Sequence, residues 1–181
     1  MSISEYRIES EAELVLTLAD ERWVDVSSKD SNEAMVRKTL LTGAAVEANF
    51  VPLKNSTASA LEGQQTCNDI IASLSRPFDV VILGMGEDGH TASLFPGIAR
   101  RALDTSSSES CISVNPENAS HERMTLTAAA LLDSRKIVFH ITGSKKWQIY
   151  QDSVSGESLE DYPVSIFLNQ NQVPVCVYWN P

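Results

Sequence analysis

The chain has 181 residues, which fits one α/β domain at roughly 150 residues per domain. Hydrophobic residues make up 43%, enough for a core, and the 21% charged residues are too few to predict disorder. The balance of 14 Lys and Arg against 24 Asp and Glu gives a formal charge of −10, which repels nucleic acid and acidic membrane surfaces. We therefore expect neither partner, and any anionic ligand must depend on a few basic side chains gathered at one site.

The three cysteines indicate a reducing compartment. Cys67, Cys111 and Cys176 lie far apart without a CxxC pair, so the pattern is neither a disulfide framework nor a zinc cage. We expect a cytoplasmic protein in which each cysteine behaves as a small apolar residue. Residues 1–10 are polar and acidic, unlike a signal peptide, and no run reaches the ~18 apolar residues of a membrane span.

The N-terminal third predicts a strand and a helix. The apolar run 14–18 is typical of a buried strand and ends at the charged cluster 20–22. Asp30 and Glu33 form a capping pair, which predicts a helix through Leu41.

A second helix and a strand follow. Ser59 and Glu62 make a capping box, and the apolar face that follows has helical spacing: Cys67, Ile70, Ile71 and Leu74. Residues 79–83 predict a second buried strand that leads directly into the glycine-rich segment 84–90.

The rest of the chain continues this alternation. We expect a surface loop at 105–110, an extended segment at 124–127, a strand at 137–142, a helix from Ser144, a helical turn after Pro163 and a last strand at 173–179. Strands alternating with amphipathic helices predict a mostly parallel sheet with helices on both faces. Ligands of such sheets bind at the carboxyl ends of the strands, where segments 20–22, 84–90 and 142–146 should meet.

The segment 84–89 matches the G-x-G-x-x-G pattern of dinucleotide-binding proteins, but its context does not fit. Glu87 and Asp88 place carboxylates where a pyrophosphate needs free backbone amides. Pro96 stops any helix soon after the loop. No second strand ends in an acidic residue ~20 positions further on.

The same glycines can instead allow a sharp turn that presents His90 at a strand end. Glu87 or Asp88 would orient its ring, which is the layout of a general base. The alternative is a structural histidine held by local hydrogen bonds. His121 and His140 lack metal-ligand spacing and are interpreted as structural, so we expect no metal.

Several basic residues are ambiguous from the residues alone. Arg22 either holds an anionic group or pairs with the acids before it. Lys145 and Lys146 either bind a phosphate or are simply solvated, and Arg123 has a similar ambiguity. Ser93 lacks the G-x-S-x-G setting of a serine hydrolase.

Four separated motifs, in order along the chain, resemble the 6-phosphogluconolactonase family: residues 20–24 followed by 30–32, 84–96, 123–127 and 142–146. The resemblance spans the chain from Leu14 to its C-terminus and implies one sugar-phosphate isomerase-like, three-layer α/β domain over residues 1–181. It also implies hydrolysis of 6-phosphoglucono-1,5-lactone, the second step of the oxidative pentose phosphate pathway.

The resemblance implies roles for individual residues. His90 would activate water for attack on the lactone carbonyl, with Asp88 and Glu87 as the acids beside it. The substrate and its phosphate would be held by Arg22, Arg123, Lys146, Gly86 and Gly89. A lactone is an activated ester, so no cofactor, metal or covalent nucleophile is expected.

The glucosamine-6-phosphate deaminases share the fold and the Asp-Gly-His core, but their motif continues with Phe-Asn-Glu-Pro. Residues 93–96 are Ser-Leu-Phe-Pro here, which favours the lactonase. A deaminase-like isomerase or an inactive homologue remains an alternative.

Family members also carry a helix and a strand ending in a Ser-Gly-Gly-Ser-type phosphate loop before the segment that matches 20–22. Only 13 residues precede Leu14 here, and no such loop occurs in the sequence. We therefore expect a sheet that lacks this strand, so that the chain is either marginally stable or self-associates through its incomplete edge.

Overall fold

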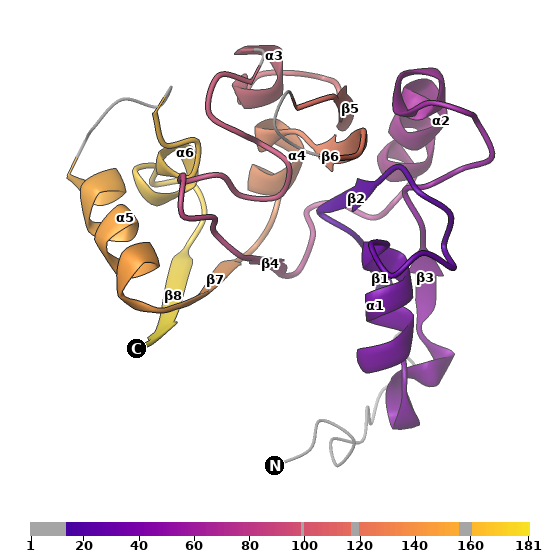
Figure 1. Ribbon diagram of the computed structural model, residues 1–181, viewed down its shortest axis with the longest axis horizontal. Helices are drawn as coiled ribbons and strands as arrows, with labels where there is room; N and C mark the ends of the chain where they lie inside the picture. The colour runs from indigo at the N-terminus through magenta and orange to yellow at the C-terminus, as the bar shows by residue number, and fades with distance from the viewer. Residues whose placement is uncertain (1–13, 99, 117–119, 156–160) are drawn as a thin grey trace.

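The computed structural model describes residues 14–98, 100–116, 120–155 and 161–181, and it has the expected α/β class. The prediction about residues 1–10 lies outside the described residues. Figure 1 shows β1, β3 and α1 on one side of the molecule, α5, α6 and β8 on the other, and β4 between them. Among the described residues, no helix is both long and apolar enough to cross a lipid bilayer.

A parallel sheet has the order β4 (Val81–Leu83), β7 (Ile137–Thr142) and β8 (Val175–Asn180). The central strand β7 alternates buried and more exposed positions, as the pleat of a strand requires. Helix α5 (Ser144–Val154) packs against β7 and against the short helix α6 (Ser165–Leu168). All of these segments were predicted from the sequence.

A second parallel pair joins β1 (Val15–Thr17) to β3 (Asn49–Val51). The strand β1 was predicted, whereas β3 was not. A 3-10 helix, η2 (Gly43–Glu47), comes just before β3. The sequence 43–51 has only short apolar stretches, so no periodic pattern predicted the strand β3.

The third sheet is antiparallel, in the order β2 (Asp20–Arg22), β6 (Arg123–Leu126) and β5 (Cys111–Val114). The extended segment predicted at 124–127 corresponds to β6, whereas β5 and the antiparallel pairing were not predicted. Its register places Arg22 directly opposite Arg123. Side chains directly opposite each other in such a pair lie on the same face, so two arginines come together here.

The helices begin close to the predicted positions. Helix α2 (Ala60–Ala72) is capped by Ser59, whose hydroxyl accepts the N–H of Glu62, as predicted. Helix α1 (Asn32–Thr39) is capped by Ser31, so the predicted capping residue Asp30 was wrong by one position. The short helices are α3 (Arg100–Leu103) and α4 (Ala128–Leu132).

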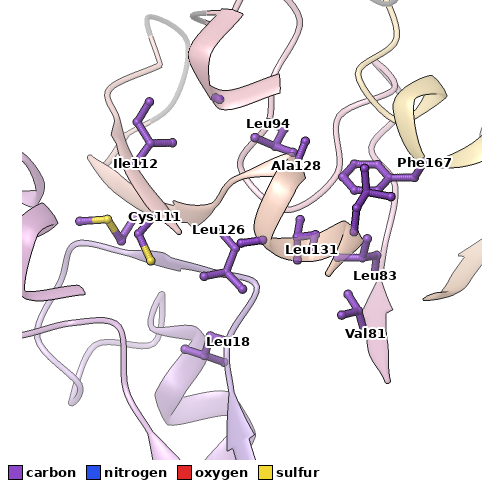
Figure 2. Close-up of a cluster of buried hydrophobic side chains, with 14 of the residues drawn as sticks. Leu18, Val81, Leu83, Leu94, Cys111, Ile112, Leu126, Ala128, Leu131 and Phe167 are labelled. Atoms are coloured by element: carbon purple, nitrogen blue, oxygen red, sulfur yellow. The ribbon is translucent and has the colours of Figure 1, made fainter. Parts of the chain in front are cut away.

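The core joins elements from both halves of the chain. Figure 2 shows Leu94, Leu126 and Leu131 close to one another, from the loop after β4, from β6 and from α4. Cys67 and Cys111 are buried, as expected, while Cys176 is half-buried, and all three are free thiols. Burial raises the pKa of the Cys67 thiol to about 11, so this group is protonated and unreactive near neutral pH.

Strands β1 and β4 do not pair with each other. In the part of the chain that the structure describes, β1 pairs only with β3 and β4 only with β7. Apolar side chains lie exposed on both: Val15 is 43% exposed, Val80 just before β4 is 53% exposed and Ile82 is 70% exposed. Among the described residues, one edge of β4 therefore has no partner strand.

Candidate active site

The glycine-rich segment after β4 is a tight turn that holds His90. The N–H of Gly86 donates to the carbonyl of His90 at 2.8 Å. A Cβ on Gly86 would overlap both the imidazole of His90 and the carboxylate of Asp88. Gly89 has a φ of +76°, and a Cβ there would overlap Tyr162. Both glycines are therefore needed to form the turn, whatever their part in binding.

His90 and Asp88 form a close imidazole–carboxylate pair, with Nδ1 of the ring 2.6 Å from Oδ1 of Asp88. Burial opposes ionisation of Asp88, but hydrogen bonds from the backbone N–H and ring of His90 outweigh it and lower the pKa of this carboxyl. Because the ionised carboxylate accepts from Nδ1–H, the neutral ring has its lone pair at Nε2. No hydrogen bond from the described residues occupies Nε2, so this atom is available to a reactant.

Glu87 takes a different partner from Asp88. Its carboxylate lies 3.4 Å from Nζ of Lys145, and both side chains are well exposed. Of the two acids considered as partners of His90, the structure pairs Asp88 with it. No ion pair or hydrogen bond among the described residues joins Lys146 to the other candidates.

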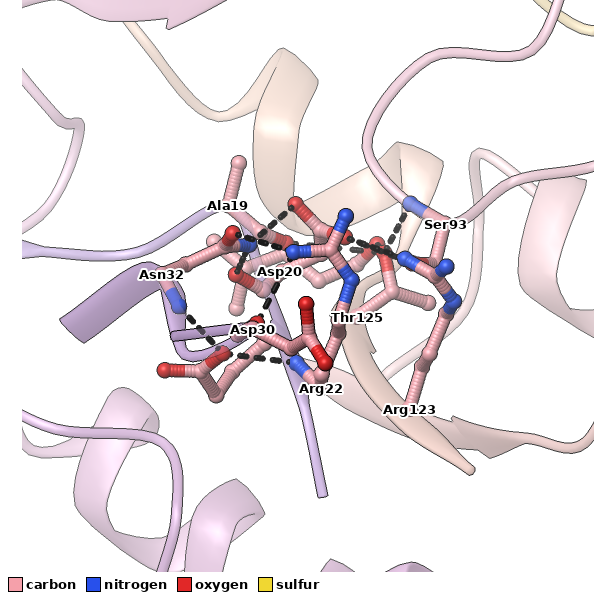
Figure 3. A network of polar contacts seen from close by, with 10 residues as sticks. Ala19, Asp20, Arg22, Asp30, Asn32, Ser93, Arg123 and Thr125 are labelled. Carbon is pink, nitrogen blue, oxygen red and sulfur yellow. Dashed lines mark hydrogen bonds and ion pairs between the residues drawn. The ribbon is translucent and has the colours of Figure 1, made fainter. Parts of the chain in front are cut away.

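Asp20 is the centre of a buried polar network, which Figure 3 shows together with Arg22 and Arg123. Its Oδ2 accepts from Ser93 Oγ at 2.6 Å and lies 3.8 Å from Arg123 Nη1. Burial raises the pKa of the Asp20 carboxyl, against the opposing effects of Ser93, Arg123, Arg22 and His90. A carboxyl with a raised pKa beside basic groups is a common feature of functional sites.

The two arginines that face each other across β2 and β6 have different partners. Arg22 Nη1 donates to the carbonyl of Asp30 at 2.8 Å, with Asn32 Oδ1 at 3.5 Å. The side chain of Arg123 is 14% exposed, and burial lowers the pKa of its guanidinium. Among the described residues, nothing accepts a hydrogen bond from its buried Nε. Two neighbouring cations with donors to spare are suited to an anionic group.

Glu21, between Asp20 and Arg22, is fully buried, with 0% of its surface exposed. Its carboxylate accepts four hydrogen bonds, from the N–H groups of Arg22, Asn32 and Glu33 and from the hydroxyl of Ser31. These donors include the first turn of α1, where a negative charge is favourable. Glu21 therefore fixes β2 to α1 and, with it, the position of Arg22.

Sequence reasoning missed the connection between Asp20 and Ser93, which are 73 residues apart. Ser93 was considered only as a nucleophile, and Asp20 only as a surface partner of Arg22. No local pattern could reveal the contact, because it depends on how β2 and the loop after β4 meet in three dimensions.

The fold and this geometry define an α/β protein with an imidazole that a carboxylate orients. Close to this imidazole lie the carboxyl of Asp20 and the pair of arginines, Arg22 and Arg123. A family model described as glucosamine-6-phosphate isomerases/6-phosphogluconolactonase matches residues 4–179. The 6-phosphogluconolactonase of Rhizobium meliloti (strain 1021) is 39% identical over 173 residues, covering 94% of this chain and 74% of that protein. That of Pseudomonas putida is 36% identical over 176 residues, covering 94% and 69%.

Solved structures agree with the sequence comparison. The crystal structure of a 6-phosphogluconolactonase from Shewanella baltica OS155 has a TM-score of 0.87 and 40% identity, over 91% of this chain and 71% of that one. A monomeric glucosamine-6-phosphate deaminase, at 16% identity and a TM-score of 0.70, shares the fold. The chain therefore belongs to the glucosamine-6-phosphate isomerase/6-phosphogluconolactonase family, and its similarity to 6-phosphogluconolactonases confirms the resemblance found in the sequence.

Proposed function

We propose that this chain hydrolyses 6-phospho-D-glucono-1,5-lactone to 6-phospho-D-gluconate in the cytoplasm, as the lactonase step of the oxidative pentose phosphate pathway. Relatives that carry the name 6-phosphogluconolactonase match nearly the whole chain at 39% and 36% identity. The observation that carries the mechanism is the 2.6 Å contact between His90 and Asp88.

In the proposed reaction, Nε2 of His90 accepts a proton from a water molecule as the water oxygen attacks the lactone carbonyl carbon. The tetrahedral intermediate then collapses, and the bond between that carbon and the ring oxygen breaks. The imidazolium returns its proton to the departing ring oxygen, which becomes a hydroxyl group. Asp88 holds the ring and stabilises the imidazolium, so the histidine ends each cycle as it began.

The substrate is an anion, and the protein carries a formal charge of −10 that opposes its approach. Arg22 and Lys146 would bind the phosphate and Arg123 would line the substrate site. The arrangement of Arg22 opposite Arg123 supports this role, because these cations are held together at the strand ends. Lys146 lies in the first turn of α5, and no hydrogen bond or ion pair among the described residues engages its side chain.

Turnover of enzymatically generated 6-phosphogluconolactone tests the proposal. The product acid releases a proton, which an indicator or pH-stat can follow, and buffer without protein measures spontaneous hydrolysis. We expect a kcat in the ordinary enzyme range of ~1–10³ s⁻¹. A rate no higher than the buffer rate would contradict the proposal and favour an inactive homologue.

A parallel assay addresses the related deaminase activity. The protein is incubated with glucosamine 6-phosphate and ammonia release is measured. We expect no ammonia, because Leu94 and Phe95 stand where the deaminase motif has Asn and Glu. Ammonia release without lactone hydrolysis would assign the deaminase reaction instead.

We propose also that the chain self-associates through the edge of β4 that has no partner strand among the described residues. The exposed Val80 and Ile82 support this, at 53% and 70% exposure, because an open apolar strand edge is a template for pairing with another chain.

A further inference from the structure

Phe95 lies against two residues of the candidate site at once. Its ring centroid is 4.6 Å from that of His90, with the two rings tilted by 41°. The guanidinium carbon of Arg123 lies 5.4 Å from the same centroid. The imidazole and the guanidinium thus share one aromatic neighbour, although they come from the loop after β4 and from β6.

The segment around Phe95 is anchored on both sides. The hydroxyl of Thr91 donates to the carbonyl of Gly84 at 2.8 Å, which closes the loop onto the end of β4. Ser93 is bonded to Asp20, and the next residue, Leu94, is fully buried in the core. The N–H of Ile98 donates to the carbonyl of Phe95 at 3.0 Å. The backbone on both sides of Phe95 is therefore anchored by hydrogen bonds that involve neither His90 nor Arg123.

The imidazole of His90 needs such a support. Its hydrogen bond to Asp88 fixes the position of Nδ1 but leaves the ring free to tilt about that contact, and the side chain is 32% exposed. A tilted aromatic contact restricts this motion and so directs Nε2. A π face also attracts cations, so one ring can favour both the guanidinium and the imidazolium that would form during turnover.

We propose that Phe95 is the positioning residue that directs the imidazole of His90 and keeps it at a fixed position relative to Arg123. This inference rests on the proposed function for its kinetic consequence, whereas its structural part can be tested without any turnover. Phe95 acts through His90 and Arg123 and does not itself react.

The test compares two substitutions of the same side chain. Phe95→Leu keeps an apolar group but removes the ring, and we expect kcat to fall ~10–100-fold, as for a small misplacement of a catalytic group, with KM within about twofold. Phe95→Tyr keeps the ring and should retain more than half of the wild-type kcat. Phe50→Leu is the matched control, because Phe50 is also a half-buried ring, with Arg37 4.7 Å from its centroid, outside the site. Its kcat should not change.

A spectroscopic readout separates this inference from the proposed function. The chain has three histidines, so the ring proton signals of His90 can be assigned by their loss in His90→Asn. The ring current of Phe95 should displace these signals in the wild type and in Phe95→Tyr, but not in Phe95→Leu.

The outcomes are distinct. An unchanged kcat in Phe95→Leu, a change in KM alone, or an equal loss in Phe95→Leu and Phe95→Tyr would each overturn the positioning role. If the wild type does not hydrolyse the lactone, the proposed function fails, and the histidine signals then decide. Signals that move only when the ring is removed support the positioning of His90, and signals that do not move overturn it.

Discussion

Arg22 and Arg123 face each other across β2 and β6, an arrangement that normally destabilises a sheet because like charges repel. One carboxylate and one backbone carbonyl beside them reduce this cost. Asp20 lies 3.8 Å from Arg123, and the carbonyl of Asp30 accepts from Arg22. An anionic ligand would neutralise the remaining positive charge. Removing one basic side chain should therefore lower the affinity for that ligand.

We expect Arg22→Ala and Lys146→Ala each to weaken binding of 6-phosphogluconate by ~1.5–3 kcal/mol, the range for hydrogen bonds to charged groups. Isothermal calorimetry measures this effect, and gluconate without the phosphate should be little affected. Lys145→Ala is the matched control, because this neighbouring lysine pairs with Glu87 on the surface. Equal losses for both ligands would contradict a role in phosphate binding.

The raised pKa of Asp20 predicts a pH-dependent stability. The folded protein holds this proton more tightly than the unfolded chain, whose carboxyl has the ordinary value of 3.8, so ionisation of Asp20 lowers wild-type stability as pH rises. Asp20→Asn has no such proton. The free energy of unfolding of the variant, minus that of wild type, should therefore increase as the pH rises above the unfolded value of 3.8. Denaturant titrations measure it, and a constant difference would show that the carboxyl is not perturbed.

At the scale of elements, local signals located most of the helices and the longer strands. Ser59 begins α2 as its capping box predicts, and β7 follows from a run of apolar residues that only His140 interrupts before Thr142. The antiparallel sheet could not be predicted in this way. Its strands have three or four residues, too few to show a period, and β2 consists of three charged residues that read as the end of a strand.

The candidate site likewise combines contacts that a local sequence motif predicts with contacts that it does not. His90 and Asp88 are two residues apart, so a local motif was enough to predict that either Glu87 or Asp88 contacts His90, and the structure selects Asp88. The partners of Asp20 come from distant segments, and the burial of Glu21 depends on the docking of α1. Such contacts follow from tertiary packing and leave no local pattern in the sequence.

Ser31, the N-cap residue of α1, contributes to the stability of the fold. The hydroxyl of Ser31 accepts the N–H of Ala34 and donates to the buried carboxylate of Glu21 at 3.0 Å. We expect Ser31→Ala to lower the free energy of unfolding by ~1–3 kcal/mol, since it removes a cap and a hydrogen bond to a buried charge. Asp30→Ala removes only a half-exposed ion pair to His121 and should cost less than about 0.5 kcal/mol. Equal effects in chemical denaturation would contradict this assignment of the cap.

At the scale of the whole molecule, the described sheets leave β4 with one unpaired edge. Ile82 points outward there with 70% exposure, next to backbone groups that have no partner strand among the described residues. Such edges are normally covered or protected by charge; the three residues of β4 are all apolar, and no described strand covers this edge.

We expect the wild type to show concentration-dependent self-association in sedimentation velocity, and Ile82→Lys to shift it toward the monomer. A lysine on an edge strand disfavours pairing because its charge would be buried. Leu61→Lys is the matched control, since Leu61 on α2 has the same 70% exposure away from this edge. A wild type that stays monomeric at all concentrations, or an equal effect of both substitutions, would contradict self-association through β4.

The most direct test of the central claim is the kcat of His90→Asn in lactone hydrolysis. Asparagine is close in size and can still donate a hydrogen bond to Asp88, but it cannot accept the proton of the attacking water. We predict that kcat falls ~10²–10⁴-fold, the usual contribution of a positioned general base, with an unchanged circular dichroism spectrum. A folded variant that keeps more than half of the wild-type turnover would contradict the assignment of His90 as the base.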